Sequence, residues 1–238
     1  LDTPMKARDR QSTSGWMVKT FFSFLTFDCY GTLIDWRKGI DIHLGNLLRK
    51  NGLASGVSVY SDYVRLEADE EHGYRSYREV LCRTAIKVAN AMKIPFSKEE
   101  ANIFASSVPL WPPFGDSVES LKQLGEKGCQ RIVLSNIDRE VLKKSLLQNN
   151  LEVDGYITAE DVGSYKPSFE HWIRFLECYK ARKEDTLHVA QSLFHDIIPS
   201  SKLGISNAWI NRYSETNDAG TVPTYVFSDL KGLVKFLG

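Results

Sequence analysis

The sequence predicts an α/β fold in which a Rossmann-like parallel sheet forms the core and a helical cap is inserted into it. Short apolar segments alternate with helical segments from residue 114 onward, as at 131–134, 140–148 and 186–190. This alternation is typical of parallel strands joined by crossover helices. Hydrophobic residues make up 42% of the 238-residue chain, which is ample for a packed core.

The first strand is predicted where an apolar run, from Phe21 to Phe27, ends on Asp28. A glycine, Gly31, follows and favours a turn. A buried strand of this kind delivers its last residue to the carboxyl edge of the sheet, where α/β proteins bind ligands. Asp28 is therefore the first candidate functional residue. The neighbouring side chain, Cys29, points to the opposite face of an extended strand and is expected to be buried and inert.

About eighty residues after Asp28 have helical patterns. Residues 77–92 place apolar side chains at helical spacing, and residues 97–108 begin with a serine and two glutamates, which is typical of a capped helix start. Two prolines, Pro112 and Pro113, then end the helical region. We interpret this region as a helical cap inserted into the core.

The predicted organisation has three parts, and the core is made from two separate stretches of chain. These are an N-terminal extension at 1–20, a core at 21–34 and 114–238, and a cap at 35–113. The first twenty residues are polar and weakly patterned. A transit peptide is one interpretation of them, but Asp2 and Asp9 favour an ordinary extension or a remnant of recombinant expression.

Composition excludes several classes of protein. Thirty basic and thirty acidic residues balance, so the chain has no net field that would attract nucleic acid or an anionic membrane. No apolar stretch approaches the roughly 20 residues needed to span a bilayer. The cysteines are scattered without metal-ligand spacing, at Cys29, Cys82, Cys129 and Cys178, as in proteins of a reducing compartment. We expect a cytoplasmic protein.

Three further segments follow Asp28 in order along the chain. One is an apolar strand ending on Ser135 and Asn136, the next is a loop lysine, Lys166, and the last is a strand followed by an acidic loop ending at Asp196. Four such segments in this order are far more specific than one motif. In these segments the chain resembles the haloacid dehalogenase superfamily, over nearly everything from Phe21 to the C-terminus.

Two departures indicate which branch of the superfamily the chain resembles. The phosphatases carry a second aspartate where this chain has Tyr30, and another where it has Gln191. A magnesium site needs carboxylates of this kind, so we expect metal-independent chemistry and no cofactor. The nucleophilic aspartate followed by Tyr-Gly-Thr resembles the type II L-2-haloacid dehalogenases.

This resemblance implies a covalent mechanism on a small-molecule substrate. Asp28 would displace halide from C2 of a 2-haloalkanoate and form an aspartyl ester, which water then opens to release a 2-hydroxy acid. Lys166 would keep Asp28 ionised. Asp196 is the expected base for the water, with help from Lys166 and Ser192.

Other residues are expected to hold or recognise the substrate. Thr32, Ser135 and Asn136 would fix the carboxylates by hydrogen bonds, although ordinary turn capping is the alternative for all three. In the dehalogenases a cap arginine receives the halide, and Arg65 is the best match. A solvated helical arginine is the plain alternative, and three other arginines compete for the role: Arg75, Arg78 and Arg83.

Several positions differ from the dehalogenase pattern. Gln191 replaces a serine, and Leu193 replaces an asparagine that helps to set up the water that opens the ester. Trp172 stands in place of a tyrosine and His195 in place of another aromatic residue. With Tyr30, we expect Gln191, Trp172 and His195 to contact the substrate. His195 is either a proton-transfer group beside Asp196 or an ordinary packing residue.

Two other functions stay open. One is hydrolysis of another small substrate, including residual phosphatase activity, on the same scaffold. The other is a non-catalytic binding protein that keeps the fold. A homodimer is compatible with two cap tyrosines, Tyr74 and Tyr77, which we expect to be exposed.

Overall fold

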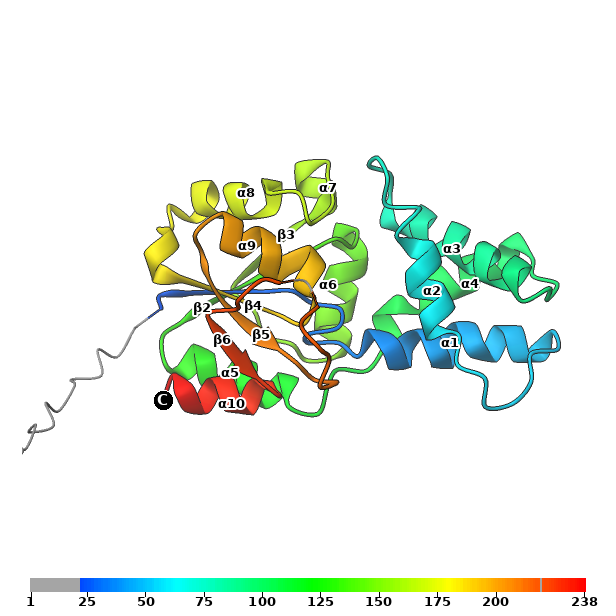
Figure 1. Cartoon of the computed structure of the whole chain (residues 1–238), viewed down its shortest axis with the longest axis horizontal. Helices are drawn as coiled ribbons and strands as arrows, with labels where there is room; N and C mark the ends of the chain where they lie inside the picture. The colour runs from blue at the N-terminus through cyan, green and yellow to red at the C-terminus, as the bar shows by residue number, and fades with distance from the viewer. Residues whose placement is uncertain (1–21, 219) are drawn as a thin grey trace, which may run out of the picture.

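The computed structural model describes residues 22–218 and 220–238 (Figure 1). The predicted extension at 1–20 lies outside the described residues. Within these ranges, no helix is both long enough and apolar enough to cross a membrane. A cytoplasmic location stays a prediction.

A six-stranded parallel sheet forms the core and confirms the predicted α/β fold. The strand order is β3-β2-β1-β4-β5-β6. The strands are β1 (Phe24–Phe27), β2 (Gln130–Ser135), β3 (Gly155–Thr158), β4 (Thr186–Ala190), β5 (Ser206–Ile210) and β6 (Tyr225–Phe227). The strands β2 and β3 are added on one side of β1, and the strands β4, β5 and β6 are added on the other side. The order in which the chain adds strands therefore reverses at β1. Ligands of open α/β sheets bind at this kind of switch point.

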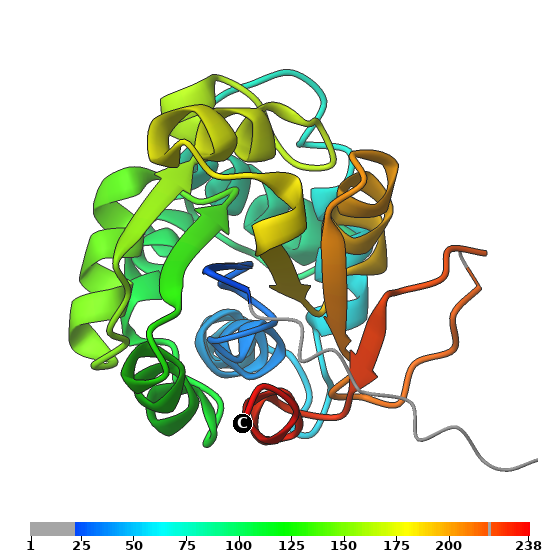
Figure 2. The ribbon, with the colours of Figure 1, turned by 90° about the vertical axis from the view of Figure 1, so that its left-hand side faces the viewer.

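Helices cover both faces of the sheet (Figure 2). They are α5 (Ser117–Glu126), α6 (Arg139–Gln148), α7 (Ala159–Val162), α8 (Glu170–Tyr179), α9 (Ile198–Lys202) and α10 (Leu230–Phe236). Ile132 of β2 packs with Phe175 of α8, whereas the next residue, Val133, shares a buried cluster with Leu121 of α5 and Leu233 of α10. Neighbouring strand residues thus face opposite layers, as the period of a strand requires.

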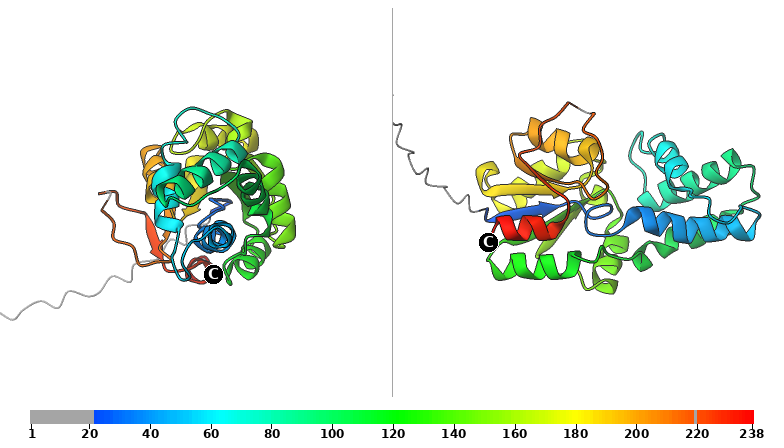
Figure 3. Two further views of the ribbon diagram at one scale, coloured as in Figure 1. Left: turned by 90° about the vertical axis from the view of Figure 1, so that its right-hand side faces the viewer. Right: turned by 60° about the horizontal axis from the view of Figure 1, so that its bottom comes forward.

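Of the helices between β1 and β2, four lie together beyond the carboxyl edge of the sheet (Figures 1 and 3). They are α1 (Trp36–Lys50), α2 (Tyr60–Glu67), α3 (Tyr77–Ala91) and α4 (Lys98–Ser107), followed by the short turn η1 (Val108–Leu110). All of them fall inside the segment predicted as the cap. The division into separate domains stays a prediction.

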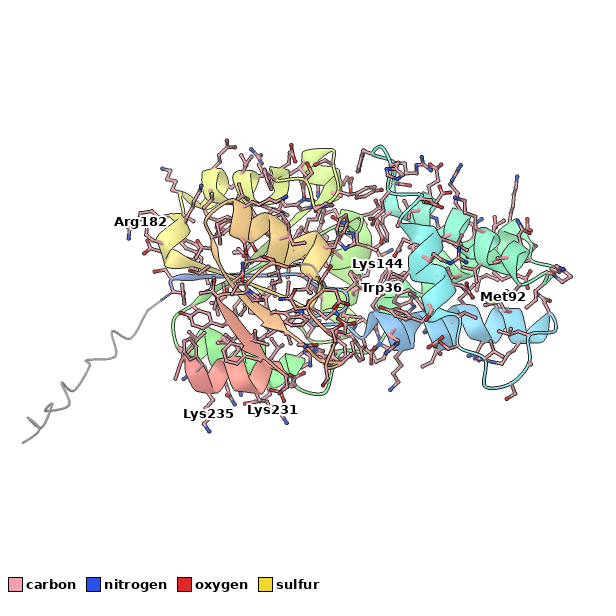
Figure 4. The ribbon with its side chains drawn as sticks, viewed as in Figure 1. Trp36, Met92, Lys144, Arg182, Lys231 and Lys235 are labelled. Carbon is pink, nitrogen blue, oxygen red and sulfur yellow. The ribbon has the colours of Figure 1, made fainter. Side chains whose placement is uncertain are left out.

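Local capping explains where two of the inserted helices begin. Asp35 accepts a hydrogen bond from the Lys38 N–H at 3.0 Å and opens α1, and Ser97 and Glu100 form a reciprocal capping box that opens α4. The serine and glutamates noted in the sequence therefore do start a helix. Figure 4 marks Trp36, the first residue of α1, where the chain passes from the core to these helices.

An aromatic cluster holds the inserted helices together. The ring of Trp36 lies 4.9 Å from that of Trp111, and Phe104 also packs on Trp111. Gly39 on α1 permits this packing, because a Cβ there would lie 2.3 Å from the Trp111 ring. Of the two tyrosines expected to be exposed, Tyr74 is exposed but Tyr77 is buried. A homodimer stays a prediction.

Candidate active site

Asp28 follows β1 directly and lies at the carboxyl edge of the sheet, as predicted. Its Oδ2 accepts a hydrogen bond from Thr32 Oγ1 at 2.7 Å. The Thr32 hydroxyl in turn accepts the Gln191 N–H at 2.9 Å, which leaves its own proton for Asp28. The chain can turn back in this way because Gly31 adopts a φ of +100°, which favours glycine.

Lys166 lies between the two carboxylates that the sequence singled out. Its Nζ donates to Asp28 Oδ1 at 2.9 Å, to Asp196 Oδ1 at 2.7 Å and to the Leu134 carbonyl at 2.9 Å. These three bonds use every donor of an ammonium group. Asn136 fixes the backbone of the lysine, accepting from its N–H at 2.7 Å and donating to its carbonyl at 3.2 Å.

Asp196 is fully buried and is held by a second partner that sequence reasoning missed. His188 on β4 contacts Asp196 Oδ1 through Nε2 at 3.0 Å and Thr26 Oγ1 through Nδ1 at 2.8 Å. The available signal was a histidine inside an otherwise apolar strand, because a buried imidazole needs a partner. Asp196 Oδ2 is buried and has no hydrogen-bond partner.

Burial and shared charge set the pKa values of this group. Burial raises the pKa of Asp28, and the pull of Lys166 in the other direction does not cancel it. Burial also acts to raise the pKa of Asp196, but Lys166 and then His188 outweigh it and hold that pKa well below its usual range. Burial disfavours the charge of Lys166, yet Asp196 and Asp28 together raise its pKa. Asp196 is thus the firm counter-ion of Lys166, and Asp28 keeps more basicity for chemistry.

A cavity of about 950 Å³ opens over this group, and residues from the inserted helices line its other side. Nine of the predicted site residues line it: Asp28, Tyr30, Ser135, Asn136, Lys166, Gln191, Ser192, His195 and Asp196. Thr32 lies behind Asp28 and contacts it directly. The structure therefore brings together most of the site predicted from four separate segments.

The supporting residues differ in what they hold. Tyr30 donates to or accepts from Ser145 Oγ at 2.6 Å, and its ring packs on Trp36 at 5.4 Å. The Ser135 hydroxyl accepts from the Ile137 N–H at 3.4 Å, which is the turn-capping alternative rather than a contact with a carboxylate. Gln191 Nε2 donates to Glu215 at 2.7 Å.

Arg65 is not brought to the cavity, which corrects the expectation that it receives halide. On α2 the residues that line the cavity include Tyr60, Val64 and Glu67, which share one helix face. Arg65 lies on another face, pairs with Asp62 at 2.8 Å and has 62% of its side chain exposed.

The competing arginines also lie elsewhere. Arg75 and Arg83 pair with Glu70 at 2.7 and 2.5 Å, and Arg78 contacts Asn102 at 3.0 Å. None of the three is among the residues that line the cavity. The partners of these three arginines therefore fit a surface or structural role better than halide binding.

A different arginine, Arg37, lines the cavity and was missed by sequence reasoning. Its guanidinium lies 4.8 Å from the centre of the Tyr60 ring and 4.9 Å from that of Tyr213. Two aromatic faces hold the cation in place. The sequence contains no local signal for this role, since Tyr213 is far away along the chain.

Trp172 is also displaced from its predicted role. It is fully buried, packs on His188 at 5.1 Å and belongs to the cluster beneath α8 with Phe175. It therefore cannot contact a substrate in the cavity. Its place on the inner face of α8 makes it a support for the histidine that holds Asp196.

The carboxylate pair does not offer an evident metal site. The Lys166 ammonium bonds to both Asp28 and Asp196, so a cation already bridges them. Among residues 22–218 and 220–238, no three histidine, cysteine, aspartate or glutamate side chains are arranged to hold a metal ion. Metal-independent chemistry stays a prediction.

The parallel sheet, with Asp28, Lys166 and Asp196 at its carboxyl edge, agrees with a comparison against known protein families. A family model for the haloacid dehalogenase-like hydrolases matches residues 24–198, from β1 to the start of α9. The chain belongs to this family. The predicted membership in the superfamily is thereby confirmed.

Three relatives show how close the likeness is. Haloacetate dehalogenase H-2 of Moraxella sp. (strain B) is 22% identical over 220 residues, which cover 90% of this chain and 96% of that protein. An L-2-haloacid dehalogenase from Xanthobacter autotrophicus, with chloropropionic acid covalently bound, has a TM-score of 0.81 at 15% identity over 91% of this chain and 98% of that one. The magnesium-bound HAD-hydrolase YfnB from Bacillus subtilis has a TM-score of 0.78 at 18% identity, over 91% of this chain and 99% of that one. At these identities the solved structures show a shared fold.

Proposed function

We propose that this protein hydrolyses carbon–halogen bonds of small 2-haloalkanoic acids through an ester on Asp28, without a metal. The observation that carries the proposal is the setting of the Asp28 carboxylate. One of its oxygens accepts from Lys166 at 2.9 Å and the other from Thr32 at 2.7 Å, and the group lines a cavity of about 950 Å³. A carboxylate held in this way can act as a nucleophile.

The proposed first step is a displacement at C2 of the substrate. An oxygen of Asp28 forms a bond to C2 while the carbon–halogen bond breaks, and the halide leaves with the bonding electron pair. Arg37 is the arginine that lines the cavity, so it replaces Arg65 as the proposed group that receives the halide. Water then attacks the carbonyl carbon of the ester and releases a 2-hydroxy acid. The relatives named for dehalogenation support this reaction class.

A second candidate substrate class is favoured by the charge of the cavity. Its acidic residues outnumber its lysines and arginines, of which Lys166 and Arg37 are the two. The acidic residues are Asp28, Glu67, Asp69, Glu71, Asp196 and Glu215. An anionic haloalkanoate would be repelled by such a surface. The alternative is therefore the same ester chemistry on an uncharged haloalkyl substrate such as a 2-haloamide.

The test is a single turnover in heavy-oxygen water, with 2-chloropropionate and 2-chloropropionamide as substrates. Solvent oxygen should enter the Asp28 carboxylate first and reach product only in later turnovers, and Asp28→Asn should release no halide. Label that appears in the first product would contradict the ester. Parallel assays of phosphate release, with magnesium and with chelator, test the phosphatase alternative, and absence of any turnover favours a binding protein.

A further inference from the structure

We propose that Glu71, His195 and Ser192 form a proton relay that activates the water which opens the Asp28 ester. This inference rests on the proposed function, since it concerns the second half of that reaction. Ser192 is the catalytic residue of the relay, because its hydroxyl would contact the water. His195 and Glu71 are positioning residues that act through it.

The three side chains form a continuous chain of hydrogen bonds at the wall of the cavity. Ser192 Oγ lies 3.2 Å from His195 Nδ1, and His195 Nε2 lies 3.2 Å from Glu71 Oε2. All three residues line the same cavity as Asp28. A hydroxyl, an imidazole and a carboxylate in this sequence are the components of a serine–histidine–acid arrangement.

The directions of the hydrogen bonds follow from the partners. Glu71 as a carboxylate only accepts, so His195 donates to it from Nε2 and keeps Nδ1 as an acceptor in the neutral ring. The backbone N–H of His195 already donates to Ser192 Oγ at 3.1 Å. The serine proton is therefore directed at Nδ1, and a lone pair of Oγ remains for a proton from water.

Asp196, the base expected from the sequence, is poorly placed for this task. Lys166 and His188 both bind its Oδ1, at 2.7 and 3.0 Å. Its Oδ2 is buried and has no hydrogen-bond partner. The same ion pairing that holds its pKa low makes it a weak base.

His195 is better suited to hold a proton. Three charged groups act on it: Glu71 from the segment between α2 and α3, Asp196 from its own turn, and Lys166 from the loop before α8. Burial acts to lower the pKa of His195, but the hydrogen bond and charge of Glu71, with Asp196, outweigh burial and Lys166 and raise it. A pKa above the ordinary value for histidine improves proton uptake near neutral pH.

The proton balance of the step is complete. Water attacks the ester carbonyl carbon, gives a proton to Ser192 Oγ, and the serine proton moves to His195 Nδ1 to form an imidazolium paired with Glu71. The bond from the carbonyl carbon to the product oxygen then breaks, and the imidazolium returns its proton to that oxygen. The carboxylic acid left on Asp28 loses its proton to solvent, which restores the carboxylate.

The relay joins two parts of the fold. His195 and Ser192 belong to the turn after β4, whose helical part η3 spans Leu193–Ile197, whereas Glu71 follows α2 among the inserted helices. Leu193 stands where the dehalogenases carry the asparagine that helps to set up this water. The apolar side chain of Leu193 cannot form a hydrogen bond with the water. In the relay, Ser192 forms this hydrogen bond, supported by His195 and Glu71.

The experiment separates ester formation from ester hydrolysis. Single turnovers of 2-chloropropionate are quenched, halide is counted, and the alkylated Asp28 peptide is measured by mass spectrometry. In His195→Gln, Ser192→Ala and Glu71→Gln we expect normal halide release, accumulated ester and hydrolysis slowed about 10²-fold or more, the usual size of a lost proton-transfer group. Glu71→Asp should recover part of the rate. Glu99→Gln, which removes an exposed carboxylate from α4, is the control with normal hydrolysis.

A second readout distinguishes this inference from the proposed function. The His195 pKa is measured by NMR in the wild type and in Glu71→Gln, and it should fall in the variant, moving the pH profile of ester hydrolysis with it. A wild type without halide release overturns the proposed function but leaves the pairing testable in this way. An unchanged His195 pKa, or equal slowing of halide release and hydrolysis in the relay variants, overturns the relay.

Discussion

At the scale of single residues, the site depends on one lysine shared by two carboxylates. Lys166 donates to Asp28 at 2.9 Å and to Asp196 at 2.7 Å, all within a buried environment. Such a group titrates as a unit, and one positive charge cannot neutralise both partners equally. His188 adds to the hold on Asp196. The consequence is a carboxylate pair in which Asp196 is the more strongly paired member, which agrees with the proposal that Asp28 forms the ester.

A pH dependence follows from this division. Asp28 must be ionised to attack, and burial raises its pKa above the ordinary 3.8 of an aspartate. Halide release in single turnovers should therefore fall as the pH is lowered through that raised pKa, and should be restored above it. Thr32→Val removes a hydrogen bond that favours the carboxylate, so the midpoint should move to higher pH. A midpoint at or below 3.8, unchanged by the variant, would contradict the assignment.

At the scale of elements, helix faces decide which side chains reach the cavity. The first turn of α1 points Arg37 inward between Tyr60 and Tyr213. On α2 the inward face excludes Arg65, although that residue is only a few positions from Tyr60. Contacts such as that of Gly39 with the Trp111 ring set how α1 packs against the segment that follows α4.

The two arginines make a direct comparison. Arg37→Ala should slow halide release about 10²- to 10³-fold, the usual effect of losing a group that stabilises developing charge. Arg65→Ala, which removes an equal charge from an exposed position, should leave the rate unchanged. Stopped-flow halide detection measures both variants. Loss of activity only in Arg65→Ala would restore the assignment made from the sequence.

Packing at Gly39 gives a stability prediction. A methyl group there would overlap the Trp111 ring, so Gly39→Ala should lower the free energy of unfolding by about 1–3 kcal/mol. Gly115→Ala is the matched control, because nothing lies within 4 Å of a Cβ at that position. Its effect should stay within about 0.5 kcal/mol. Urea unfolding of both variants measures the difference, and equal stabilities would refute the packing argument.

At the scale of the whole molecule, the cavity between sheet edge and inserted helices carries an excess of acids. Burial, followed by the nearby charge of Glu71, raises the pKa of Glu67 to about 8, so this carboxyl is mostly neutral at pH 7. The other acidic residues lining the cavity still outnumber Lys166 and Arg37. A substrate anion entering from solvent therefore meets a repulsive surface, although the chain as a whole is neutral.

This surface predicts how the substrate affinity responds to charge. Glu215→Gln removes one cavity acid, so KM for 2-chloropropionate should fall about two- to fivefold, and added salt should reduce that difference. KM for uncharged 2-chloropropionamide should not change in the variant. Steady-state halide release gives both values. A variant that lowers KM equally for the anion and the amide would show that charge is not the cause.

The sheet, the family and the residues at the strand ends could all be predicted from the sequence. Apolar strands, their turn residues and the order of Asp28, Lys166 and Asp196 are local features, and a parallel sheet necessarily gathers strand ends at one edge. It also indicated the inserted helices through their caps and spacing. These features require no knowledge of which distant segments touch.

The helix faces and loops that complete the site could not be predicted from the sequence and became visible only in the folded chain. Arg37, and not Arg65, lines the cavity, and Trp172 lies in the core. Glu71 and His195, which are 124 positions apart in the sequence, lie 3.2 Å from each other. Such contacts depend on the rotation and docking of whole helices, which result from packing many apolar side chains at once. No local pattern in the chain encodes that rotation.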